Sequence, residues 1–129
     1  MILVDSSVWI DFLSSRTGHA GAELRRMIQD NEPLAVTGVV IAEVLQGLIR
    51  NAYTIEQFLA QFEILEPKGL KTYSTAAAMY RTARGKGISL TTIDTLIAAI
   101  AIENGASVFT MDQDFSRIAL ITPLVLHRF

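Results

Sequence analysis

The 129-residue chain has no cysteine, only three prolines and a single tryptophan. Without thiols it cannot form disulfides, use a thiolate nucleophile or bind zinc through cysteine. Only 19% of the residues are charged while half are hydrophobic, a composition that favours one large core and argues against disorder. A chain without cysteine is compatible with a reducing compartment, and we expect a cytoplasmic protein.

The sequence also lacks a long apolar run and an excess of basic residues. Its longest wholly apolar stretch, residues 96–102, is too short to cross a bilayer, so no membrane span is expected. No basic leader precedes an apolar region at the start, so no secretory signal is expected either. The net charge of −2 counts against a simple nucleic-acid-binding module, but it does not exclude a nuclease whose acidic residues hold a metal.

Five short β-rich runs alternate with segments of helical periodicity. The expected strands are 2–5, 34–37, 62–66, 107–110 and 124–126, and the expected helices are 8–13, 22–29, 38–50, 54–61, 70–83 and 94–103, with a short helical turn at 115–118. The strand cores are continuously apolar rather than alternating, which is typical of parallel strands covered on both faces. The pattern predicts a single α/β domain over residues 1–129, a three-layer sandwich with a mainly parallel five-stranded sheet flanked by helices.

Polar residues at the helix starts provide candidate caps. Ser6 or Ser7 can cap the first helix, and Thr54 with Gln57 forms the spacing of a capping box. The Thr91-x-x-Asp94 spacing predicts a third cap.

Four acidic residues occur where a strand ends or early in a helix. Asp5 ends the first strand and Asp112 lies just past the fourth, while Glu43 and Asp94 lie in the first two turns of their helices. Ligands bind beyond the carboxyl ends of parallel strands, so all four carboxylates can face one rim of the sheet. Clustered carboxylates are costly unless a cation holds them, and oxygen-only ligands suit Mg²⁺ or Mn²⁺. The sequence therefore predicts a divalent-metal site formed by these four residues.

Each of these acids also has an ordinary structural explanation. Asp94 could serve only as a helix-cap partner, and Asp112 alone is typical of a turn. Glu43 alone is typical of a solvated helix surface. Asp5, at the end of a buried run, has the weakest alternative, so the prediction depends on the convergence of all four.

Four segments of the chain, each centred on one of these acids, follow one another in order. They are Leu3-Val4-Asp5-Ser6-Ser7-Val8-Trp9-Ile10, Val39-x-x-Ala42-Glu43-Val44-x-x-Gly47, Thr92-Ile93-Asp94 followed by Leu96-Ile97-Ala98-Ala99, and Thr110-Met111-Asp112-Gln113-Asp114-Phe115. Together they resemble the motifs of PIN-domain ribonucleases, especially the VapC toxins of prokaryotic toxin–antitoxin pairs. Each segment alone is weakly specific, whereas four in this order are specific.

The resemblance implies a metal-dependent endoribonuclease with Asp5, Glu43, Asp94 and Asp112 as catalytic residues and metal ligands. It further implies an RNA substrate, a PIN-like five-stranded parallel sheet, a homodimer and inhibition by a cognate antitoxin. The role of Asp114 stays open between an outer position around the metal and a partner within a local turn. The role of Ser7 stays open between supporting the Asp5 carboxylate and capping a helix. A groove lined by residues such as Trp9, Phe12 and Leu48 is a candidate antitoxin surface.

Two other functions are weighed against this one. An aspartate-based phosphoryl-transfer domain of similar build would need a second acid beside Asp5 and a lysine after a late strand, but Ser6 and Ser7 follow Asp5 and no lysine follows Leu90. A catalytically silent PIN-like module that only binds a partner is the other alternative, and the presence of all four acids argues against it.

Overall fold

Four parallel strands form the centre of the molecule in the computed structural model, which describes residues 1–129. The strands are β1 (Ile2–Val4), β2 (Leu34–Thr37), β3 (Glu63–Leu65) and β4 (Ser107–Phe109). They lie in the order β3-β2-β1-β4, and every neighbouring pair is parallel. The two central strands, β2 and β1, are almost entirely buried, as their continuous apolar sequences predict.

The register of β1 and β4 brings two of the predicted acidic positions to one edge of the sheet. Leu3 pairs with Val108 and Val4 pairs with Phe109. The backbone N–H of Asp5 then donates to the carbonyl of Phe109 at 2.9 Å. The chain therefore leaves both strands at the same edge, so that Asp5 and the segment 110–112 lie side by side.

The predicted fifth strand at 124–126 does not form, and the expectation of five strands was wrong. This segment makes one isolated parallel bridge, between Val108 and Leu126. The N–H of Val108 donates to the carbonyl of Val125 at 2.9 Å, and the N–H of His127 donates to Val108 at 2.8 Å. These bonds hold the segment beside β4 over too few residues to make a ladder, and the side chain of Val125 faces solvent.

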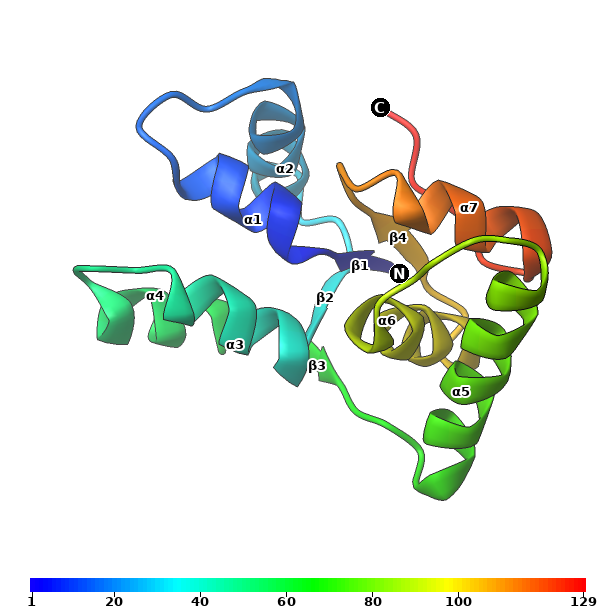
Figure 1. Cartoon of the computed structure of the whole chain (residues 1–129). Helices are drawn as coiled ribbons and strands as arrows, with labels where there is room; N and C mark the ends of the chain where they lie inside the picture. Colours follow the sequence, from blue (N-terminus) through cyan, green and yellow to red (C-terminus); the bar gives the residue numbers. More distant parts are fainter.

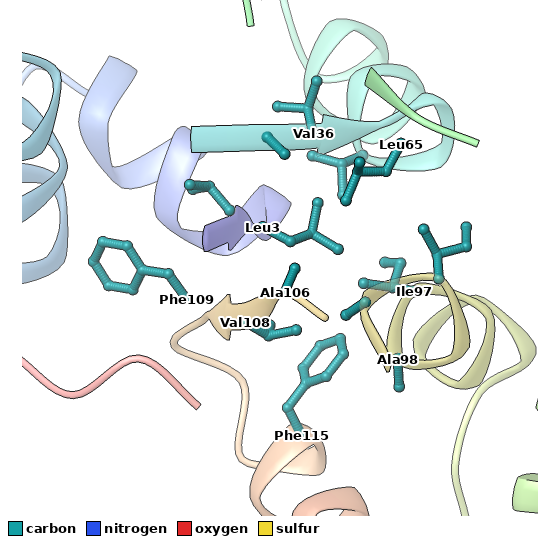
Figure 2. Packing of buried hydrophobic residues seen from close by; sticks show 14 of the residues in the cluster. Leu3, Val36, Leu65, Ile97, Ala98, Ala106, Val108, Phe109 and Phe115 are labelled. Carbon is teal, nitrogen blue, oxygen red and sulfur yellow. The ribbon is translucent and has the colours of Figure 1, made fainter. Parts of the chain in front are cut away.

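Seven helices connect and flank the strands. They are α1 (Ser6–Leu13), α2 (His19–Gln29), α3 (Gly38–Gln46), α4 (Ala52–Leu59), α5 (Leu70–Gly85), α6 (Thr92–Glu103) and α7 (Asp114–Ile121). Figure 1 shows α5 and α6 to one side of the sheet and α1 and α2 to the other, and each of these pairs is in contact. In the core, Ile97 of α6 and Phe115 of α7 lie on one side of the strands, whereas Phe109 points to the opposite side (Figure 2).

The helix caps follow the sequence only in part. Thr91 caps α6 as predicted, accepting the N–H of Asp94 at 3.1 Å. Helix α1 begins directly after Asp5, so neither Ser6 nor Ser7 is its cap. Helix α4 begins at Ala52, after a left-handed residue at Asn51 with φ of 62°, so the predicted capping box two residues later does not form. Helix α3 ends at Gln46, four residues before the predicted end.

The single tryptophan belongs to the core rather than to a surface. The ring centroid of Trp9 lies 5.9 Å from that of Phe58 and 5.2 Å from that of Phe62, and no part of Trp9 is exposed. This aromatic cluster fixes α1, and with it the start of the segment after Asp5, against α4. The expectation that Trp9 lines a partner surface was therefore wrong. No helix in the structure combines the length and apolar composition that a bilayer crossing requires.

Candidate metal centre

Asp5 is the most rigidly held acid at the carboxyl edge of the sheet. It follows β1 directly and is only 4% exposed. Its Oδ2 accepts two hydroxyl hydrogen bonds, from Ser7 Oγ at 2.8 Å and from Thr110 Oγ1 at 2.9 Å. Both donors act on the same oxygen, so the carboxylate is oriented while its second oxygen makes no hydrogen bond within the protein.

The same two hydroxyls also fix the loop that follows β4. Ser7 Oγ accepts the backbone N–H of Met111 at 3.0 Å, and Thr110 Oγ1 accepts the backbone N–H of Asp112 at 2.9 Å. Ser7 and Thr110 thus link the end of β1 to the segment that carries Asp112. The question that the sequence left open for Ser7 is answered by these contacts, because its hydroxyl supports Asp5 and caps no helix.

Three aspartates form a second group at this edge, which we call the acidic cluster. Asp94, Asp112 and Asp114 each offer one carboxylate oxygen, and these oxygens lie within 4.8 Å of one another. Asp94 comes from the first turn of α6, where Thr91 caps the helix, and the other two come from the β4–α7 connection. The N–H of Asp114 donates to Asp112 Oδ1 at 2.9 Å, which keeps the second and third carboxylates together.

Glu43 lies beside Asp5 rather than in the acidic cluster. Its Oε1 accepts a hydrogen bond from Ser6 Oγ at 3.1 Å, which ties the carboxylate of α3 to the first residue of α1. Burial is the main cause that raises the pKa of Glu43, and the negative charge of Asp5 raises it further, against the opposing effect of the bond from Ser6.

Asp94 is the electrostatic centre of the site. Burial raises its pKa to about 6, although the hydrogen bond with Thr91 opposes the shift. The negative charges of Asp112, Asp5 and Asp114 add to the increase, in that order. Without a cation, the carboxylates at this edge therefore repel one another, and part of the Asp94 population is protonated near neutral pH.

The residues at this edge fit a hard divalent cation. All the donors are carboxylate oxygens, and the only ion pair to any of the five acids is the one from Arg117 to Asp114, at 3.1 Å. Clustered, poorly neutralised carboxylates are the arrangement that Mg²⁺ and Mn²⁺ stabilise. The structure thus contains a cluster of three acidic residues that could bind a metal ion.

The sequence-predicted residues are distributed over two adjacent groups. Asp94 and Asp112 lie in the acidic cluster, while Asp5 and Glu43 form the neighbouring group through their charges and the hydroxyls of Ser6 and Ser7. Asp114, which the sequence left open between an outer position at the site and a local turn role, lies in the acidic cluster. Its signal was its place two residues after Asp112, in the first turn of a helix that the sequence predicted only as a short turn at 115–118.

The chain is similar to known proteins over most of its length. The family model of the PIN domain matches residues 2–121. The chain is 33% identical over 128 residues to a VapC ribonuclease of Mycobacterium bovis, an alignment that covers 96% of both chains. Ribonuclease VapC11 of Mycobacterium tuberculosis matches at the same identity and coverage.

Solved structures show the same fold at lower sequence identity. The VapBC complex of Salmonella typhimurium bound to DNA contains a chain that matches with a TM-score of 0.78 and 18% identity, covering 98% of this chain and 96% of that one. A chain of VapBC2 from Rickettsia felis, bound to a DNA fragment of its promoter, matches with a TM-score of 0.76 and 21% identity, covering 100% and 99%.

Proposed function

This chain belongs to the PIN-domain family and, within it, to the VapC ribonucleases, and from that membership we propose that it is a metal-dependent endoribonuclease acting as the toxin of a toxin–antitoxin pair. The observation that carries the proposal is the convergence of acids from four distant parts of the chain at one edge of the sheet. Asp5 and Glu43 meet there through their charges, and Asp94 lies with Asp112 and Asp114. A fold that needed no cation would gain nothing from this repulsion.

The proposed ligands of the cation are Asp5, Glu43, Asp94 and Asp112, with Asp114 as an additional member of the cluster. Mg²⁺ or Mn²⁺ matches a set of oxygen donors that leaves room for water and for substrate phosphate oxygens. A bound divalent cation would supply charge neutralisation and Lewis-acid activation for the hydrolysis of an RNA phosphodiester.

Neighbouring hydroxyl groups orient the acidic residues of the site. Ser7 and Thr110 orient Asp5 through its Oδ2, and the other carboxylate oxygen makes no hydrogen bond within the protein. Ser6 holds Glu43, and Thr91 fixes the helix start that carries Asp94. Because the pKa of Asp94 is about 6, its carboxyl group can exchange a proton with the solvent near neutral pH, and cation binding would favour its ionised form.

The antitoxin is the second proposed partner. An open cleft between α1 and the α3–α4 connection is lined by Leu13, Leu48, Ile49 and Ile55. Ile49 is 97% exposed beside this cleft, and we propose that the antitoxin covers it. Of the residues that the sequence predicted for this groove, Leu48 lines the cleft, whereas Trp9 is buried and Phe12 is not among the lining residues. We further propose a homodimer and a cytoplasmic location, as expected for this class of toxin.

The two alternatives are weakened by the same geometry. A phosphoryl-transfer domain would use Asp5 as a nucleophile, but two hydroxyl donors orient its carboxylate and the chain has no lysine after residue 90 to assist the transfer. A silent binding module would have no use for poorly neutralised acids whose mutual repulsion lowers stability.

RNA cleavage mapping with purified protein tests the proposal. A labelled pool of cellular RNA is incubated with the parent protein, with and without about 5 mM Mg²⁺ or Mn²⁺, a range suited to weakly bound ions. We expect discrete products that require the metal and that are absent with Asp5→Asn. An exposed matched control, Asp30→Asn, should cleave like the parent. Equal cleavage by parent and Asp5→Asn, or identical cleavage in EDTA, would rule out the proposed centre.

A further inference from the structure

The stretch between Glu66 and Asp94 has a charge unlike that of the rest of the chain. It contains five basic residues and no acidic residue, while the other parts of the chain hold six basic and all thirteen acidic residues. We call these five residues the basic segment: Lys68, Lys71, Arg81, Arg84 and Lys86.

The fold makes little use of these charges. All five side chains are exposed, and none forms an ion pair, because the salt bridges of the structure involve only Arg26, Arg117 and His127 as cations. Lys68 alone has a hydrogen-bond partner, the backbone carbonyl of Glu103 at 2.9 Å. The other four have no hydrogen-bond acceptor within the protein, so stability of the fold does not explain them.

Helix electrostatics account for only part of the pattern. Arg84 lies in the last turn of α5, where a positive charge is favourable to the helix dipole. Lys71 lies in the first turn, where the same charge is unfavourable. Arg81 and Arg84 are three residues apart on the exposed side of α5, so they repel each other with no acid between them. An external anion beside the two arginines would relieve this repulsion.

The end of α5 that carries Arg81 and Arg84 leads toward the acidic cluster, whereas Lys68 lies at the other end of α6, where it contacts Glu103. Helix α5 packs against α6 and α7, the two helices whose first turns carry Asp94 and Asp114. Figure 1 shows the chain returning from the end of α5 to the start of α6, so that the residues after Lys86 lead to the capping residue Thr91. A polyanion engaged at the acidic cluster can therefore continue onto this side of the molecule.

We propose that the basic segment binds the phosphate backbone of the RNA substrate, with Arg81 and Arg84 as its central contacts. The inference rests on the proposed function and names the surface that provides its affinity. A cation at the metal centre is largely compensated by the carboxylates that hold it, so basic side chains outside the centre supply the attraction for the RNA backbone. Arginine suits this task because its planar guanidinium pairs with phosphate oxygens through two hydrogen bonds. Tyr73, about half exposed and on the same side of α5, adds a surface for base stacking.

Salt-dependent RNA binding tests this assignment. Every protein carries Asp5→Asn so that the probe is not cleaved, and the probe is a labelled mixed-sequence RNA of about 20 nucleotides, long enough to cover several phosphate contacts. The test variant is Arg81→Gln/Arg84→Gln. The matched control is Arg16→Gln/Arg50→Gln, which removes the same charge from two exposed arginines that also lack ion pairs. Both variants should melt like the parent.

We expect the test variant to bind about tenfold more weakly and to lower the slope of log affinity against log salt by about 1.4, roughly 0.7 for each lost phosphate contact. The control should change affinity less than about twofold at the same slope. Equal weakening by both variants, or an unchanged slope in the test variant, would overturn the inference. RNA cleavage by the protein that retains Asp5 separates the two proposals. If this protein cleaves RNA but the test variant binds RNA normally, only the present inference fails. If this protein neither binds nor cleaves RNA, both proposals fail.

Discussion

The two halves of the metal centre differ in how their charges are satisfied. Asp5 is nearly fully buried but receives two hydroxyl hydrogen bonds on one oxygen. Asp94 lies with two other aspartates in the acidic cluster, and burial, followed by the charges of its acidic neighbours, raises its pKa to about 6. Hydrogen bonds within the protein thus orient Asp5, whereas we propose that a cation compensates the charges of the acidic cluster.

The largest expected effect comes from removing the charge of Asp94. Asp94→Asn should lower RNA cleavage by at least about 100-fold, because a proposed metal ligand is lost, and should raise the melting temperature of the metal-free protein by about 2–5 °C, because the repulsion in the acidic cluster is relieved. Cleavage assays and thermal unfolding in EDTA measure the two effects.

Asp5→Asn is the matched comparison for this variant. It should abolish cleavage equally but leave the melting temperature unchanged or lower, because hydroxyl donors already stabilise the Asp5 carboxylate. If both variants raise the melting temperature by the same amount, the two halves of the site do not differ in the proposed way.

The hydroxyl of Thr110 should matter next. Thr110→Val removes the bond to Asp5 Oδ2 and the acceptor for the N–H of Asp112, so we expect cleavage to fall about 10-fold and stability to fall by about 1–2 kcal/mol. Thr110→Ser keeps the hydroxyl and should restore most of the activity. If the serine variant is as impaired as the valine variant, packing of the methyl group, not the hydrogen bond, is what the site requires.

The pH dependence of metal-free stability should report the raised pKa of Asp94 independently of any activity assay. The folded-state pKa of Asp94 is about 6, above its ordinary value of 3.8, so the folded protein binds this proton more tightly than the unfolded chain. Its unfavourable contribution is absent below about pH 4 and complete above about pH 6, so metal-free stability should decrease across this range. Partial exposure limits the decrease to about 1–2 kcal/mol.

Urea unfolding in EDTA between about pH 4 and pH 7.5, which brackets the two pKa values, measures this decrease. Other carboxylates titrate in the same range, so the informative quantity is the difference between the parent and Asp94→Asn. The pKa of Glu43 is also raised, so Glu43 should likewise lower metal-free stability as the pH rises. This contribution remains in Asp94→Asn. If stability falls with pH equally in the two proteins, ionisation of Asp94 is not unfavourable in the folded state.

The smallest expected effect is stabilisation by the ion itself. Addition of about 10 mM Mg²⁺ or Mn²⁺ to the metal-free protein should raise the melting temperature by about 2–4 °C, because an ion bound only to the folded state stabilises it. Asp112→Asn should remove this shift, and Ca²⁺ should be compared to test the preference for a small cation. A shift of the same size in Asp112→Asn would place the bound ion outside the acidic cluster.

The parts of the fold that the sequence predicted well are those with strong local signals. β1, β2 and β4 are mostly buried, as their apolar sequences indicate, whereas Leu65 is the only buried residue of β3, and α6 begins where Thr91 caps it. Weak or competing signals account for the errors. The segment 124–126 looks like a strand locally, but only one bridge to β4 is available to it. The Thr54 capping box was overridden because a left-handed residue at Asn51 started α4 earlier.

By itself, the sequence determined which acids are available and that each lies at the end of a buried strand or early in a helix, because apolar runs and caps are encoded over a few neighbouring residues. The partners of those acids depended on tertiary structure. Ser7 and Thr110 are 103 residues apart, yet both donate to Asp5, and Asp114 joins Asp94 only because α6 and α7 start at the same edge of the sheet. Parallel register and helix packing decide such contacts, and no local pattern contains them.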